Sequence, residues 1–147
     1  MKFSCQKCGW CCENIVISVS YSDIHKWFEA GRFDLLQEVS FIANYPRKNT
    51  GGFFIAKTAF NPKQPCPFLV KENGVGSCSI QDIKPRACKD YPWSHDKMEG
   101  CPAFPEVQGK NLSVRKQVFK SQYKDFKKAF FNRAELLHIL TKARNVT

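Results

Sequence analysis

Eight cysteines constrain the fold and the chemistry of this chain more than any other feature. Four of them span eight residues near the N-terminus in the pattern C-x2-C-x2-C-C, and four are spread over the middle of the chain. In chain order they are Cys5, Cys8, Cys11, Cys12, Cys66, Cys78, Cys88 and Cys101. Thiolates bind zinc and iron–sulfur clusters far better than they bind magnesium or calcium. Two groups of four therefore predict two four-thiolate metal centres, or one cluster with a second site beside it.

The cysteine pattern favours metal ligation over disulfides. No apolar stretch after Met1 has the character of a signal peptide, and no run has the length of a membrane span, so we expect a cytoplasmic protein. Thiols stay reduced in that compartment and remain free to bind metals. The adjacent Cys11 and Cys12 also argue against disulfides, because each would need its own distant partner.

The N-terminal cysteines form one compact set of ligands. A C-x2-C turn brings two sulfurs to the same side, and a third cysteine at the same spacing resembles the ligand triple of bacterial ferredoxins. Side chains of adjacent residues point in different directions, so we expect Cys11 and Cys12 to serve two neighbouring centres that later cysteines complete. The partition of the eight ligands stays open, and so does a ligand role for His95.

Length and composition predict one α+β domain with a loop-rich, metal-ordered part. The chain has 147 residues, of which 43% are hydrophobic, and this is enough for a hydrophobic core. Residues 20–23 fit a capping box, which marks the start of a helix. The remaining patterns predict a strand over 15–19, a helix over 24–30 that ends at Gly31, a helix over 33–43 and a strand over 53–60.

The second half of the chain changes composition at about residue 108. Residues 61–108 hold seven of the eight prolines and show no periodicity, so we expect little regular structure there and expect bound metal to order the segment. The sequence thus predicts a cysteine-cluster metal-binding domain over 1–108. A basic helical extension over 109–147 follows, and we expect it to pack on the same domain.

The C-terminal extension carries most of the positive charge. Its apolar spacing predicts a helix over 113–131 and a last helix after Asn132. Residues 110–147 contain ten Lys and Arg and two acidic residues, Asp125 and Glu135, which gives +8 of the chain's formal charge of +10. Basic helices of this kind predict RNA or an RNA–protein assembly as partner; a merely solvated surface and a membrane-surface helix stay open. We expect the apolar stripe of the longer helix to face the core: Val114, Val118, Phe119, Tyr123, Phe126 and Phe130.

Short motifs around the cysteines match a known pattern. They are Phe3-x-Cys5-x-x-Cys8-Gly9-x-Cys11-Cys12, Cys66-Pro67-Phe68-Leu69, Cys78-Ser79-Ile80, Lys84-Pro85-Arg86-Ala87-Cys88-Lys89-Asp90-Tyr91-Pro92 and Cys101-Pro102. Over about residues 3–102 the chain resembles the YkgJ-type cysteine-cluster family, whose members are described as zinc- or iron-chelating. It departs from that family at the flanking positions Gln81, Lys84 and Tyr91 and keeps all the expected ligands.

The favoured interpretation is a non-catalytic metal-binding protein with two structural four-cysteine zinc sites and a basic surface for RNA. No Ser/His/Asp set, phosphate loop or dinucleotide fingerprint is present in the sequence. Asp82, Arg86 and Asp90 surround Cys88 and are placed to form hydrogen bonds that tune a metal site. Two alternatives remain: a [4Fe-4S] protein in redox chemistry, sulfur transfer or protein modification, and a metal chaperone or store.

Overall fold

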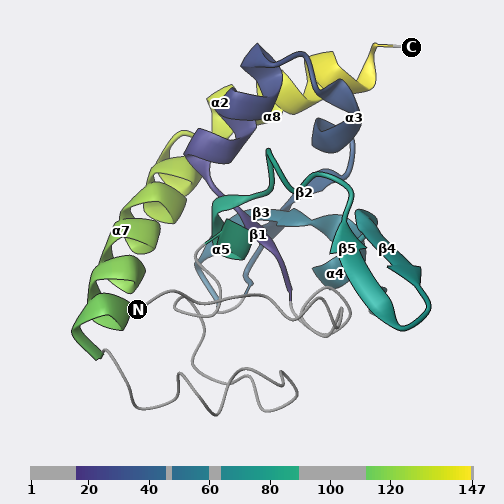
Figure 1. The fold of residues 1–147 in the computed structure, drawn as a ribbon. Helices are drawn as coiled ribbons and strands as arrows, with labels where there is room; N and C mark the ends of the chain where they lie inside the picture. Colours follow the sequence, from purple (N-terminus) through teal and green to yellow (C-terminus); the bar gives the residue numbers. More distant parts are fainter. Residues whose placement is uncertain (1–15, 46–47, 60–63, 90–111, 147) are drawn as a thin grey trace.

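A three-stranded antiparallel sheet lies at the centre of the fold, with helices packed around it (Figure 1). The structure is a computed structural model that describes residues 16–45, 48–59, 64–89 and 112–146. The strands are β1 (Ser18–Val19), β2 (Val39–Ala43) and β3 (Gly51–Ile55), in the spatial order β1-β3-β2. Together with the helices described below, they confirm the predicted α+β class.

The central strand β3 pairs with both neighbours through aromatic and β-branched residues. Phe53 lies opposite Val19 on one side and Phe41 on the other. The rings of Phe41 and Phe53 meet edge to face, with their centroids 5.2 Å apart. A Cβ at Gly51 would lie 2.8 Å from the Phe41 ring, so the glycine makes room for this contact. Such cross-strand contacts fix the register of the sheet.

The predicted capping box is present and begins helix α2 (Tyr21–Glu29). The backbone N–H of Asp23 donates to Ser20 Oγ at 3.2 Å, and the Ser20 N–H donates to the Asp23 carboxylate at 3.0 Å. Gly31, with a φ of 69°, follows the end of the helix, as the sequence predicts. Local chemistry alone therefore sets both ends of α2.

The helix predicted over 33–43 is wrong in its second half. Only α3 (Phe33–Leu36) is helical, and residues 39–43 form β2. Pairing with β3 places Val39 opposite Ile55, and both side chains are fully buried. Burial on a sheet outweighs helical spacing here because strand formation depends on packing partners far away in the chain.

The strand predicted over 53–60 is correct only as far as Ile55, where α4 (Ala56–Ala59) begins. The buried hydroxyl of Thr58 donates to the carbonyl oxygen of Ile55 at 2.7 Å. Thr58 Oγ1 in turn accepts a hydrogen bond from the backbone N–H of Ile17 at 3.1 Å. Thr58 therefore closes the helical turn and also holds the segment that leads into β1.

A β-hairpin lies in the segment that the sequence predicts to be irregular. It consists of β4 (Leu69–Glu72) and β5 (Val75–Cys78). Asn73 and Gly74 between them have φ values of 51° and 78°, which are the left-handed conformations of a two-residue hairpin turn. The Asn-Gly pair is therefore a signal in the sequence that predicts this hairpin. A short helix, α5 (Arg86–Lys89), comes next among the described elements.

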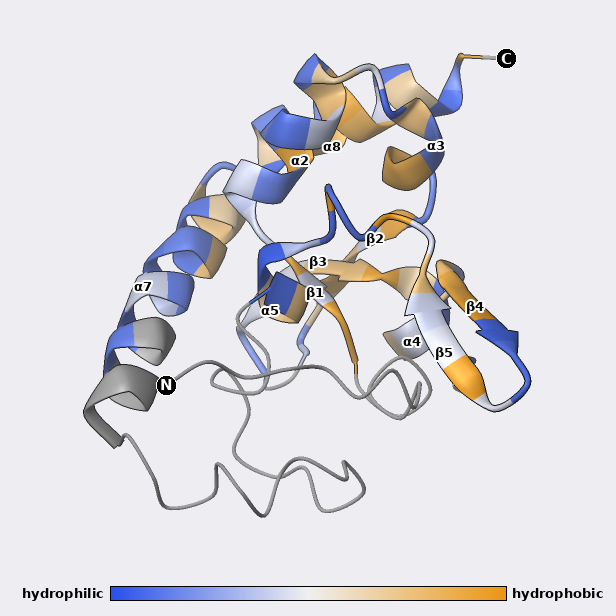
Figure 2. Ribbon diagram, in the orientation of Figure 1, coloured by the Kyte–Doolittle hydropathy of each residue, from blue (hydrophilic) through white to orange (hydrophobic). Residues whose placement is uncertain are grey.

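The two predicted C-terminal helices are confirmed as α7 (Leu112–Phe131) and α8 (Arg133–Arg144). Helix α8 packs with α2 and α3, and α7 packs along α2 and β3 (Figure 1). Hydrophobic residues concentrate in the sheet and on α3 and α8, whereas α7 is largely hydrophilic (Figure 2). The shared core includes Trp27, Leu35, Leu36, Val39, Leu136, Ile139, Leu140 and Ala143. No helix among the described residues has the length and apolar character that crossing a bilayer requires.

Candidate metal centre

Three of the eight predicted ligands fall within the described residues. Cys66 comes just before β4, Cys78 ends β5, and Cys88 lies in α5. The other predicted ligands lie outside the described residues, and so does the candidate His95: Cys5, Cys8, Cys11, Cys12 and Cys101. The geometry of the candidate site is therefore built from its second group of cysteines.

All three described cysteines belong to the hydrophobic core or pack against it. Cys66 is buried within it, with 7% of its surface exposed, and Cys78 and Cys88 pack against it while half-buried. The cluster includes the buried Ile80 and borders Phe68. Thiols at the edge of a packed core are held in place and shielded from water, and this suits ligands of a closed metal site.

Main-chain hydrogen bonds of the hairpin position Cys66 and Cys78. Cys78 pairs with Leu69 in the β4–β5 ladder. The Leu69 N–H donates to the carbonyl oxygen of Cys66 at 3.1 Å, and the Ser79 N–H donates to that of Phe68 at 2.8 Å. Both cysteines therefore lie at the same end of the hairpin.

A buried carboxylate positions the turn that carries Cys88. The backbone N–H of Arg86, the first residue of α5, donates to both oxygens of Asp23 at 3.0 and 3.1 Å. Asp23 is 2% exposed, and its carboxylate also accepts from Ser20 in the capping box of α2. The Cys88 N–H in turn donates to the carbonyl oxygen of Pro85 at 2.9 Å. One carboxylate thus stabilises the first turns of both α2 and α5.

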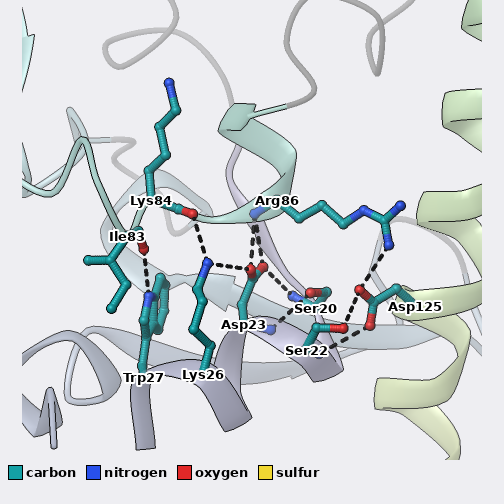
Figure 3. Close-up of polar contacts among 9 residues, drawn as sticks. All are labelled: Ser20, Ser22, Asp23, Lys26, Trp27, Ile83, Lys84, Arg86 and Asp125. Carbon is teal, nitrogen blue, oxygen red and sulfur yellow. Dashed lines mark hydrogen bonds and ion pairs between the residues drawn. The ribbon is translucent and has the colours of Figure 1, made fainter. Parts of the chain in front are cut away.

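Two side chains of α2 hold the residues just before α5 (Figure 3). Trp27 Nε1 donates to the carbonyl oxygen of Ile83 at 2.7 Å. Lys26 Nζ donates to the carbonyl oxygen of Lys84 at 3.3 Å and lies 3.7 Å from the Asp23 carboxylate. Helix α2 therefore fixes the backbone that leads to Cys88 at three successive points.

The side chain of Arg86 extends this network to α7 (Figure 3). Its guanidinium donates to Asp125 Oδ2 at 3.1 Å and also to the Ser121 hydroxyl. Asp125 accepts two further hydrogen bonds from Ser22, one from the backbone N–H at 3.1 Å and one from the hydroxyl at 2.7 Å. The carboxylate of Asp125 therefore connects α7 to the first turn of α2 and to the segment of Cys88.

Burial and hydrogen bonding shift the pKa values of Asp23 and Asp125 in opposite directions. Burial raises the pKa of Asp23, against the hydrogen bonds from Ser20 and Arg86 that favour its ionised form. Burial acts to raise the pKa of Asp125 as well, but the hydrogen bonds from Ser22 and Arg86 outweigh it and hold that pKa below its usual value. Burial also lowers the pKa of Lys26. Asp125 is thus the firmly ionised partner of Arg86.

Within the part of the chain that the structure describes, no three His, Cys, Asp or Glu side chains form a group that could hold a metal ion. The donor chemistry of the three cysteines, all sulfur, nevertheless fits zinc or iron.

The sequence matches the CxxCxxCC family, described as a putative zinc- or iron-chelating domain, over residues 4–127. The chain belongs to this family. The CxxCxxCC match contains all eight cysteines and both partners of the Arg86–Asp125 ion pair. Membership supports the predicted binding of zinc or iron. No curated protein and no solved structure matches the chain.

The sequence points to only part of the network around Cys88. Of the three residues predicted to tune the site, Arg86 forms hydrogen bonds with Asp23, Asp125 and Ser121, Asp82 is exposed, and Asp90 lies outside the described residues. The carboxylates that bind Arg86, those of Asp23 and Asp125, come from distant segments, and nothing near Cys88 in the sequence indicates them. One signal for Asp125 is present, because it is the one acidic residue in the sequence of α7.

Proposed function

We propose that this member of the CxxCxxCC family binds two metal ions through its eight cysteines, that these metals stabilise the fold, and that its basic C-terminal helices bind RNA. The main support is the position of the three described cysteines, which come from separate segments and border one core. Metal bound there would cross-link segments that have short or irregular backbone structure.

All eight cysteines serve as ligands in this proposal, four to each centre. The adjacent Cys11 and Cys12 support two neighbouring sites, because adjacent side chains diverge. Zinc is the metal that closed four-cysteine sites in loop-rich proteins commonly hold. When bound, it supplies cross-linking free energy to the fold and opens no coordination position to a substrate.

Metal analysis after anaerobic purification tests this proposal. We expect a colourless protein that contains zinc, and we expect a chelator to unfold it, because the binding free energy of a structural zinc is folding free energy. Replacing Cys66, Cys78 or Cys88 by Ala, one at a time, should remove about half of the bound zinc if each belongs to one of two four-cysteine sites. A protein that stays folded after metal removal would contradict the structural role and favour a metal store.

An iron–sulfur protein is the second candidate, favoured by the spacing of Cys5, Cys8 and Cys11. It predicts a brown protein with visible absorbance, iron and acid-labile sulfide. The same purification decides between the two metals.

The RNA part of the proposal is supported by the charge of α7. Its lone carboxylate, Asp125, is buried and neutralised by Arg86, so it does not offset the surrounding lysines. Among the side chains that the structure describes on the two helices, the exposed basic residues are Lys120, Lys124, Lys127, Lys128, Arg133, Lys142 and Arg144. Such a surface can bind a phosphate backbone through release of counterions.

A titration with RNA at two salt concentrations tests this part. We expect binding that weakens steeply as salt rises, because each neutralised phosphate contributes about −0.7 to the slope of log K against log salt for a single strand. Absence of binding, or binding that is insensitive to salt, would contradict an RNA partner and leave the metal sites unaffected.

A further inference from the structure

The outer face of α7 carries two exposed aromatic rings among lysines. Tyr123 is 66% exposed and Phe131 is 67% exposed. Lys127 lies between them in the sequence, and its Nζ is 5.8 Å from the centroid of each ring. Each residue of a helix turns by about 100°, so these residues, Lys120 and Lys124 all lie within an arc of about 100°. We call these five residues the aromatic–lysine face.

Packing does not account for the exposed rings. Among the α7 side chains that the structure describes, the buried ones are Gln122, Asp125 and Ala129, which point away from the aromatic–lysine face. The prediction that Tyr123 faces the core is therefore wrong, and Phe126 and Phe130 are only partly buried. The helix is anchored by Asp125 and Ala129, which leaves Tyr123 and Phe131 free to bind a partner.

We propose that the aromatic–lysine face binds single-stranded RNA, with bases stacked on Tyr123 and Phe131 and phosphates held by the lysines. This inference rests on the proposed RNA partner. It adds where on the protein the RNA binds and that the bound RNA is single-stranded. Aromatic side chains in basic surfaces stack on unpaired bases of any sequence, whereas paired bases are not accessible to them. The face therefore selects single strands over duplexes.

The spacing of the rings fits a short run of nucleotides. Tyr123 and Phe131 are eight residues apart, which corresponds to about 12 Å along a helix. Stacked nucleotides rise by about 3.4 Å along one strand, so about three to four of them cover this distance. Lys120, Lys124 and Lys127 then offer roughly one ammonium group for each phosphate along that stretch.

Lys127 has a particular place in this site. Its ammonium group interacts with the faces of both rings, and this limits the conformations of all three side chains before RNA binds. Ordering a long side chain in advance reduces the entropy lost on binding.

The composition of the face favours RNA over a membrane surface. A helix that lies in a bilayer needs a continuous apolar side. On α7 the side opposite the lysines packs against β3 and α2, and the outer face has two aromatic rings among three lysines. An RNA strand would contact both the lysines and the rings of this face, whereas lipid tails would contact only the rings.

Fluorescence anisotropy with a short labelled single-stranded RNA tests the proposal on the full-length, metal-containing protein. The first variant carries Tyr123→Ala and Phe131→Ala. Its matched control carries Tyr123→Phe and Phe131→Tyr, which keep both rings. Both substituted positions are exposed in the folded protein, and far-ultraviolet circular dichroism checks that each variant remains folded.

We expect the ring-deleted variant to bind at least about fivefold more weakly for each ring lost, with an unchanged salt slope. The ring-retaining control should bind like the wild type. Lys127→Gln should reduce the salt slope by about 0.7, as expected for one lost phosphate contact. The same RNA annealed to its complement should bind more weakly than the single strand.

Equal binding by the wild type and the ring-deleted variant would overturn the stacking site while leaving an RNA partner in place. No binding of RNA by the wild type at either salt concentration would overturn both proposals. Tighter binding of the duplex, or binding of anionic phosphatidylserine vesicles that depends on the two rings while RNA binding does not, would also overturn the stacking site.

Discussion

The guanidinium of Arg86 lies 3.1 Å from the carboxylate of Asp125, and this ion pair joins the segment of Cys88 to helix α7. The side chain of Asp125 is 6% exposed and that of Arg86 is 31% exposed. Because Arg86 also donates its backbone N–H to Asp23, one residue holds the cysteine segment against two helices. The basic helix and a predicted metal ligand are therefore coupled through packed, hydrogen-bonded groups.

Replacing Asp125 by Asn should lower the free energy of unfolding by about 1–3 kcal/mol, because it removes a charged acceptor from Arg86 and Ser22. Urea unfolding of the metal-containing protein measures the change. Asp34→Asn is the control, since Asp34 pairs with Arg32 at an exposed position where ion pairs contribute about 0–1 kcal/mol. Equal effects of the two substitutions would show that the Arg86–Asp125 pair behaves as an ordinary surface pair.

Replacing Thr58 by Val should destabilise the protein by about 1–3 kcal/mol, because the side chains have similar shape but valine leaves the buried N–H of Ile17 without its acceptor. Thr141→Val is the matched control: the Thr141 hydroxyl is exposed and donates to the carbonyl oxygen of Leu137. We expect that control to change the unfolding free energy by less than about 0.5 kcal/mol. Thermal or urea unfolding distinguishes the two, and a neutral Thr58→Val would mean that Ile17 finds another acceptor.

Local chemistry made part of the fold predictable. The capping box of Ser20 and Asp23 and the glycine after α2 are signals within a few residues of the helix ends. Strand β2 depends instead on pairing Val39 with Ile55, sixteen residues later, so its helical spacing predicts the wrong structure. The β4–β5 hairpin was only partly predictable, because its Asn-Gly turn is a local signal but is only two residues long.

In the candidate site, too, features set by nearby residues can be predicted from the sequence, and contacts between distant segments cannot. Cysteine chemistry predicts the type of ligand from the sequence, and the position of Arg86 beside Cys88 predicts a supporting role. The partners of Arg86 cannot be found by spacing, since Asp23 and Asp125 lie 63 and 39 residues away from it. Likewise, helical periodicity alone predicts that Tyr123 faces the core. Because Asp125 is the buried residue instead, the side of α7 that carries Tyr123 is exposed.

Replacing Gly74 by Ala should cost about 1 kcal/mol of stability, because alanine is strained at a φ of 78°. No atom lies within 4 Å of the added Cβ, so backbone strain alone accounts for the loss. Asn73→Gly is the matched control in the same turn, and its effect should stay within about 0.5 kcal/mol. Because the hairpin positions Cys66 and Cys78, Gly74→Ala should also make chelation of the metal faster. Unchanged stability would argue against the two-residue turn.

The phenol of Tyr21 should ionise at higher pH than an ordinary tyrosine. Partial burial raises the pKa of Tyr21, and so does the Glu135 carboxylate, to which its hydroxyl donates at 3.0 Å. Ultraviolet titration of the wild type minus that of Tyr21→Phe isolates this group, and Glu135→Gln should move its transition back toward the usual value of about 10.

The same shift has a consequence for stability. A group whose pKa is raised in the folded state favours its protonated form there, so its contribution is complete below the unfolded pKa and is lost as pH rises through the folded value. Stability should therefore fall less steeply above about pH 10 in Tyr21→Phe than in the wild type, because the variant lacks this titration. Identical alkaline slopes in urea unfolding of the two proteins would show that the Tyr21–Glu135 contact between α2 and α8 does not form in solution.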